Sequence, residues 1–140
     1  MSRTQEYDLA KELLYNVNIT VTNQRLAILA YLLKLDGHPT AEEIYEELKD
    51  QLPILSKATV YNTLQTLVKE NVLEELTIEK ERARYHLVNG YHPHFFCTKC
   101  RKIFNLSAES LNVEDKDEIE GHKIEKRQCW FIGICSECRK

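Results

Sequence analysis

The chain has 140 residues, enough for one ordinary domain or two small ones, and its 43% hydrophobic and 29% charged residues are typical of a globular protein, not a disordered one. Its longest uncharged apolar stretch, residues 26–33, is too short to cross a bilayer, so we expect no membrane contact, and the polar start predicts a cytoplasmic protein. The net charge is −3, and residues 1–88 carry 10 Lys and Arg against 14 Asp and Glu. That balance argues against nucleic-acid binding.

Helical periodicity dominates residues 1–70. A first helix is expected around Leu9, Leu13 and Leu14. Thr22 is a plausible N-cap for a second helix, because apolar residues follow at the i, i+3, i+4, i+7 spacing between residues 26 and 33.

Two further helices are predicted before residue 70. Thr40 and Glu43 form a capping box, in which each side chain satisfies the other residue's backbone N–H, and this third helix is expected to continue to Pro53. Ser56 caps the fourth helix, whose buried stripe comprises Val60, Leu64, Leu67 and Val68.

After Asn71 the period changes to two. Apolar residues alternate with polar ones over residues 75–78 and 83–87, and the charged residues 79–82 between them predict a hairpin tip. Helices followed by a two-stranded ribbon indicate a winged helix, in which the helix before the wing is the recognition helix of a helix-turn-helix.

Residues 92–140 are different in kind, because they are strand-like and carry all the cysteines. A unit of this size needs a metal, a partner subunit or both. One long apolar strand is predicted over residues 124–134, which suggests a sheet completed across a homodimer. We therefore expect an α+β protein with a winged-helix domain at 1–88, a hinge at 89–91, and a small α/β dimerisation and metal-binding domain at 92–140.

Four cysteines form two C-x-x-C pairs, Cys97 with Cys100 and Cys135 with Cys138. Two such pairs predict a closed tetrahedral Zn²⁺ site, which is structural because no coordination position stays open. A thioredoxin-like redox pair is the less favoured alternative, because no βαβ pattern surrounds it. Cys129 is expected to be a plain buried thiol.

The histidines suggest a second metal site. His92 and His94, two residues apart on an extended segment, face the same way, so both imidazoles can bind one ion. His38 could be a solvated loop residue and His86 an exposed strand residue, but a site joining all four would tie the two domains together. His122 has no evident partner and is expected at the surface.

Four segments together resemble the ferric uptake regulator (Fur) family, and within it the peroxide-sensing (PerR) branch: Gly37-His-Pro-Thr-Ala-Glu-Glu-Ile-Tyr45, Ala58-Thr-Val-Tyr-Asn-Thr-Leu64, His92-x-His94-x-x-Cys-x-x-Cys100 and Cys135-x-x-Cys138. The resemblance covers about residues 8–139. It implies a dimeric, metal-dependent transcriptional repressor of oxidative-stress and metal-homeostasis genes, and no enzyme.

The resemblance also implies a regulatory metal site. It places His38, His92 and His94 at the branch's three histidines, whereas His86 and Asn105 stand where the branch has two aspartates. Ligands without formal charge suit Fe²⁺ and other borderline divalent ions, and suit Mn²⁺ less well.

The predicted fourth helix supplies the expected contacts to double-stranded DNA, an AT-rich inverted repeat. Asn62 can pair with an adenine edge, and Ala58 can contact a thymine methyl group. The remaining contacts are expected from Gln65 and, as phosphate anchors, from Arg25, Lys57, Thr59 and Tyr61. A lone amphipathic helix would be read as a solvated face, but the following wing and the resemblance favour DNA.

Three other functions compete with peroxide sensing. The protein could be an iron, zinc or nickel sensor of the Fur or Zur type without a peroxide response. The acidic first half would also suit a zinc-ribbon interaction module that does not bind DNA. An enzyme is the weakest alternative, because nothing in the sequence resembles a nucleophile paired with a base.

Overall fold

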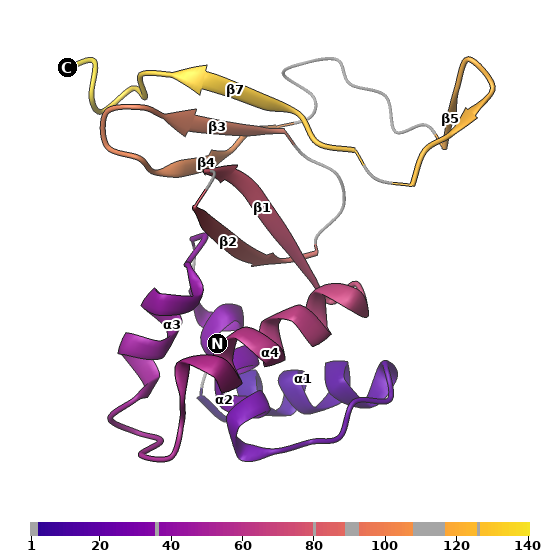
Figure 1. The fold of residues 1–140 in the computed structure, drawn as a ribbon, viewed down its shortest axis with the longest axis vertical. Helices are drawn as coiled ribbons and strands as arrows, with labels where there is room; N and C mark the ends of the chain where they lie inside the picture. Colours follow the sequence, from indigo (N-terminus) through magenta and orange to yellow (C-terminus); the bar gives the residue numbers. More distant parts are fainter. Residues whose placement is uncertain (1–2, 36, 80, 89–92, 108–116, 126) are drawn as a thin grey trace. The chain divides into compact units, whose positions relative to one another are not determined.

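The computed structural model describes residues 3–35, 37–79, 81–88, 93–107, 117–125 and 127–140. The chain divides into two compact units, residues 1–88 and 89–140 (Figure 1). The predicted hinge at 89–91 and the predicted ligand His92 lie outside the described residues. Within the described part of the chain, no helix has the length and hydrophobicity needed to cross a membrane.

Four helices form the base of the first unit: α1 (Arg3–Asn16), α2 (Asn23–Lys34), α3 (Ala41–Leu48) and α4 (Lys57–Lys69). The three predicted N-caps are confirmed. The hydroxyl of Thr22 accepts a hydrogen bond from the backbone N–H of Arg25, Thr40 from that of Glu43, and Ser56 from that of Thr59. The capping hydroxyls satisfy donors that the first helical turn leaves unpaired.

The core of the first unit lies between all four helices and the two-stranded ribbon that follows them; α3 contributes Ile44 and Leu48. The predicted stripe of α4 is confirmed for Val60, Leu64 and Leu67, all at most 1% exposed, whereas Val68 is only partly buried. Burial of this stripe leaves the opposite face of α4 exposed to solvent.

Helix α3 is shorter than predicted, since it ends at Leu48 and not at Pro53. The carbonyl of Leu48 accepts from both Gln51 and Leu52, so the chain turns away here. Pro53 disfavours helical geometry only in Leu52, the residue before it, so the earlier end at Leu48 follows from this turn and not from the proline.

The predicted wing is an antiparallel pair of strands, β1 (Leu73–Glu79) and β2 (Arg82–Leu87). The prediction was wrong about its tip. Glu79 belongs to β1, and its side chain is only 3% exposed. Its Oε1 accepts a hydrogen bond from the Nε of Arg84 at 3.0 Å, which compensates the carboxylate for its burial. An irregularity between Leu76 and Glu79 breaks the strict alternation and turns this carboxylate inward.

The second unit contains a three-stranded sheet in the order β4-β3-β7, made of β3 (His94–Cys97), β4 (Ile103–Asn105) and β7 (Trp130–Gly133). Strands β3 and β4 are antiparallel, whereas β3 and β7 are parallel. A separate small hairpin joins β5 (Glu118–Ile119) to β6 (His122–Lys123).

The single long strand predicted over residues 124–134 is wrong, because among the described residues of this range only Trp130–Gly133 form a strand. Strand β3, with which β7 pairs, has only four residues, so β7 has no further strand residues to pair with. Strand β7 is an edge of the described sheet, and Phe131, Ile132 and Ile134 on and beside it are 42%, 61% and 43% exposed.

Candidate metal centres and nucleic-acid interface

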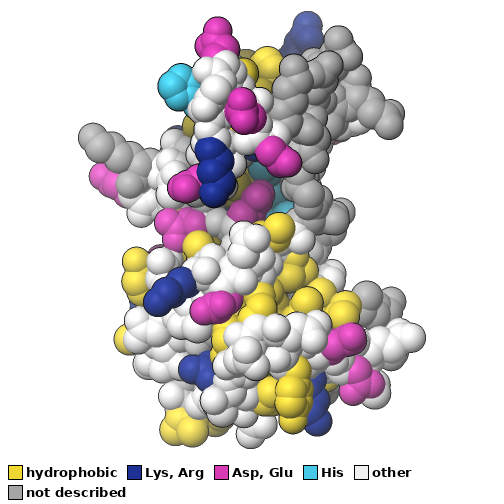
Figure 2. Space-filling model, turned by 90° about the vertical axis from the view of Figure 1, so that its right-hand side faces the viewer, with side chains coloured by type: hydrophobic (Ala, Val, Ile, Leu, Met, Phe, Trp, Pro, Cys, Tyr) yellow, Lys and Arg dark blue, Asp and Glu magenta, His cyan; other side chains and the backbone are white. Residues whose placement is uncertain are grey.

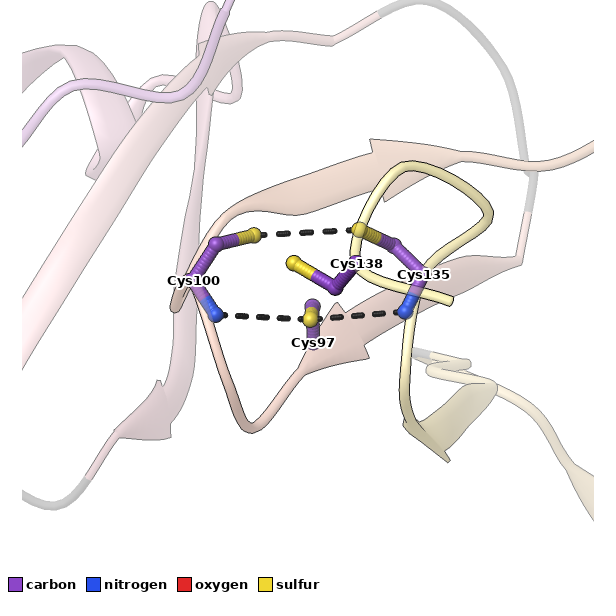
Figure 3. A group of neighbouring side chains, drawn as sticks. All are labelled: Cys97, Cys100, Cys135 and Cys138. Carbon is purple, nitrogen blue, oxygen red and sulfur yellow. Dashed lines mark hydrogen bonds between the residues drawn. The ribbon is translucent and has the colours of Figure 1, made fainter. Parts of the chain in front are cut away.

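The four predicted zinc ligands form one cluster (Figure 3). Cys97 is the last residue of β3 and Cys100 lies on the turn after it, whereas Cys135 and Cys138 follow the end of β7. Parallel pairing of β3 with β7 carries both turns to the same end of the sheet. The four sulfurs lie within 4.8 Å of one another.

The dimensions of this cluster fit a tetrahedral ion. Four sulfurs about 2.3 Å from one zinc ion would stand about 3.8 Å apart. The Sγ atoms of Cys100 and Cys135 are 3.8 Å apart. The residues present therefore suit a metal that prefers thiolate ligands and closed tetrahedral geometry.

The electrostatics of the cluster also favour a cation. The backbone N–H groups of Cys100 and Cys135, each 3.4 Å from the Sγ of Cys97, lower the pKa of that thiol to about 6. Hydrogen bonding to Cys135, with burial and the other thiols adding to it, raises the pKa of Cys138 to about 12. Four thiols this close cannot all ionise without a positive ion between them.

Cys129 and His122 were predicted to lie outside the metal sites. Cys129 is half-buried, and its backbone carbonyl accepts from the N–H of His94 at 2.9 Å. His122 is exposed on the β5–β6 hairpin. Neither belongs to the cysteine cluster.

The first unit brings His38 and His86 together, with ring centroids 4.7 Å apart. The Nδ1 of His86 lies 3.1 Å from the carbonyl oxygen of Gly37. A carbonyl oxygen only accepts, so Nδ1 carries the proton and the lone pair of the ring is on Nε2. That is the form in which a histidine binds a metal through Nε2.

The second unit brings together His94 and Asn105, which are paired directly across β3 and β4. His94 is buried and stacks on Trp130, with ring centroids 4.9 Å apart. The predicted regulatory ligands thus form a pair in each unit, and His92 lies outside the described residues.

The exposed face of α4 carries most of the predicted DNA contacts. Ala58, Tyr61 and Asn62 are exposed, and Lys57 lies 3.9 Å from a carboxylate oxygen of Glu42 with its side chain 63% exposed. An open groove runs beside this face and the start of α2, lined by Thr22, Gln24, Arg25, Thr59, Asn62, Thr63 and Thr66. Gln24 was not among the predicted contacts; only its helical spacing could have placed it there.

Gln65 has contacts within the protein. Its Nε2 donates to Glu75 Oε2 at 2.6 Å and to the hydroxyl of Tyr85 at 3.1 Å, both on the wing. The amide therefore joins α4 to the wing, and a DNA contact from Gln65 stays a prediction. Arg25 is half-buried, and one of its nitrogens donates to the carbonyl of Thr20 at 2.7 Å.

The face of the molecule drawn in Figure 2 is not broadly basic, since Lys and Arg side chains stand singly among Asp and Glu side chains.

Comparison with known proteins identifies the family. The Ferric uptake regulator family matches residues 16–131. The peroxide operon regulator of Bacillus subtilis (strain 168) is 34% identical over 133 residues, which cover 94% of this chain and 92% of that protein.

Solved structures agree with the sequence comparison. The ferric uptake regulator of Francisella tularensis, solved with iron, superposes with a TM-score of 0.72 at 25% identity and covers 87% of this chain and 96% of its own. PerR from Streptococcus pyogenes, solved to explain peroxide sensing and gene regulation by that protein, is 29% identical and superposes with a TM-score of 0.54. The match covers 95% of this chain and 92% of that protein's chain. With the winged helix and the cysteine cluster, these matches establish that this chain belongs to the ferric uptake regulator family.

Proposed function

We propose that this protein is a metal-dependent transcriptional repressor that responds to peroxide. The observation that carries the proposal is the pair of imidazoles, His38 and His86, of which His86 lies on strand β2 of the wing in the proposed DNA-binding unit. Relatives named as peroxide regulators at 30–34% identity support the peroxide response.

The cysteine cluster is proposed to hold a structural Zn²⁺. Zinc would neutralise the four thiolates and fasten the turn after β3 to the turn after β7, which is a large contribution to the stability of so small a unit. The unit is also proposed to form a homodimer, because the outer edge of β7 exposes Phe131 and Ile132.

The regulatory metal is proposed to bind His38 and His86 from the first unit and His92, His94 and Asn105 from the second. An ion that needs both groups would hold the units in one arrangement, and DNA binding would follow that arrangement. Uncharged nitrogen and amide ligands favour Fe²⁺ over Mn²⁺.

Such a ligand set has an electrostatic consequence. Aspartate ligands would cancel the charge of a divalent ion, whereas histidines leave it in place. Residues 1–88 have a net charge of −4, so the ion would reduce repulsion from phosphates. We therefore expect the gain in DNA affinity on metal binding to shrink at high salt.

DNA recognition is proposed to centre on Asn62 and Ala58, which are exposed on α4. Asn62 would read an adenine edge in the major groove, whereas Lys57, Thr59, Tyr61 and Arg25 would contact phosphates. The proposed operator is an AT-rich inverted repeat, since a symmetric dimer matches a symmetric site.

An iron, zinc or nickel sensor without peroxide chemistry remains the second candidate, favoured by the absence of aspartates at positions 86 and 105. One experiment separates the two. Protein loaded anaerobically with Fe²⁺ is bound to an inverted-repeat duplex, treated with peroxide, and analysed by peptide mass spectrometry. Peroxide sensing predicts release from DNA and one added oxygen atom on a peptide holding His38 or His92. Unmodified protein that stays on the duplex identifies the plain metal sensor.

A further inference from the structure

The loop that carries His38 is held by strand β2 through three successive carbonyl groups. The carbonyl of Gly37 accepts from Nδ1 of His86, and the carbonyl of Pro39 accepts from the backbone N–H of Tyr85 at 2.9 Å. Between them, the carbonyl of His38 itself accepts from Nη1 of Arg84 at 2.9 Å. Arg84 is therefore the side chain that fixes the backbone of the proposed ligand directly.

The guanidinium of Arg84 has little freedom to move. Its side chain is 12% exposed, and its Nε donates to Glu79 Oε1, whose own side chain is 3% exposed. Glu43 Oε1 at the start of α3 lies 3.7 Å from Nη1. Because a guanidinium is planar, the Nε bond to Glu79 fixes the direction in which Nη1 points.

We infer that Arg84 is a positioning residue for the proposed regulatory metal site: it holds the backbone of His38 so that the imidazole stands beside His86 before any metal binds. The inference rests on the proposed function, and it assigns Arg84 no contact with the metal. Because Arg84 already orders the His38 loop, less conformational entropy is lost when the metal binds, and the affinity for the metal is higher.

The expected size of the effect follows from other metal sites. Groups that orient the ligands typically contribute about 10–100-fold in metal affinity. The neighbouring carbonyls of Gly37 and Pro39 keep their own bonds to β2, so part of the loop stays in place. We expect loss of the Arg84 bond to weaken metal binding about 10-fold, at the lower end of that range.

The test is a Co²⁺ titration of the full-length, zinc-containing protein, followed by the visible absorption of the bound ion. Arg84→Lys is the main variant, because an ammonium can pair with Glu79 but cannot also present a fixed second N–H to the His38 carbonyl. Arg82→Gln is the matched control. Arg82 lies on the same strand and contacts Glu43 at 3.3 Å, but its side chain is 51% exposed and no bond joins it to the His38 loop among those described.

The inference predicts that Arg84→Lys binds Co²⁺ about 10-fold more weakly, with altered absorption bands, while Arg82→Gln matches the wild type. Thermal unfolding at 222 nm checks that each variant is folded. If Arg84→Lys is not, Glu79→Gln takes its place: it removes the charge that holds the Nε of Arg84 and leaves only a neutral acceptor, so a smaller weakening of Co²⁺ binding in the same direction is expected. Wild-type affinity and spectrum in a folded variant would overturn the inference alone. A wild-type protein that binds no Co²⁺ beyond its zinc would overturn the proposed regulatory site itself.

Discussion

The buried ion pair between Glu79 and Arg84 gives a prediction about stability that does not depend on any metal. Replacing Glu79 with Gln removes a carboxylate that is 3% exposed and leaves a guanidinium that is 12% exposed. The shape of the side chain is nearly unchanged, so the experiment measures the missing charge.

The magnitude can be worked from the contacts. Removing one partner of a buried ion pair typically costs about 3–5 kcal/mol. Two features of this site reduce the cost: the Gln oxygen can still accept from Nε, and Glu43 lies 3.7 Å from the same guanidinium. We expect the free energy of unfolding of residues 1–88 to fall by about 2 kcal/mol.

The assay is urea unfolding of the full chain followed by circular dichroism at 222 nm, because the described helices all lie within residues 1–88. Glu46→Gln is the control, since Glu46 and its partner Lys49 are 59% and 41% exposed and should contribute nothing measurable. If Glu79→Gln unfolds at the same urea concentration as Glu46→Gln, the buried pair does not stabilise the wing and our account of the tip is wrong.

Three other predictions concern the zinc site, the recognition helix and the wing. Cys97→Ser is expected to remove about one zinc ion per chain and to weaken the dimer, measured by elemental analysis and sedimentation; full zinc content would contradict the assignment. Asn62→Ala should weaken binding to the specific duplex by about 1–3 kcal/mol and spare nonspecific binding, whereas Lys57→Ala should weaken all sequences alike and reduce the salt dependence; equal loss in both variants would refute this division of roles. Burial raises the pKa of Tyr85 to about 12 from its ordinary value of 10, so the folded state holds its proton more tightly and the stability of the unit should fall as pH rises from 10 to 12. Tyr85→Phe should lack that alkaline loss in urea unfolding across this pH range, and an unchanged pH dependence would show that another group causes it.

Much of the fold could be predicted because the first half of the chain is governed by local rules. Thr22, Thr40 and Ser56 cap helices as expected, since a side-chain oxygen three residues before an unpaired N–H is a local signal. The early end of α3 depends on the turn closed by the carbonyl of Leu48, and the inward turn of Glu79 depends on its ion pair with Arg84 on β2. Alternation alone does not contain that information.

The candidate sites show the same division. The cysteine cluster could be predicted because C-x-x-C spacing fixes which thiols share a turn, and the structure gathers all four. The role of Gln65 could not, because its partners Glu75 and Tyr85 lie 10 and 20 residues away on the wing. Helical geometry placed Gln65 away from the core, but only the tertiary structure shows that the wing covers it.

Metal-dependent DNA binding tests the central claim most directly. Fluorescence anisotropy with an AT-rich inverted-repeat duplex is measured anaerobically for the wild type and for His86→Ala, with Fe²⁺ and with a chelator too weak to remove the structural zinc. The account predicts tight, salt-sensitive binding by the wild type with Fe²⁺ alone, and weak binding by His86→Ala under both conditions with its zinc content intact. Equal affinity with and without Fe²⁺, or an unaffected His86→Ala variant, would contradict it.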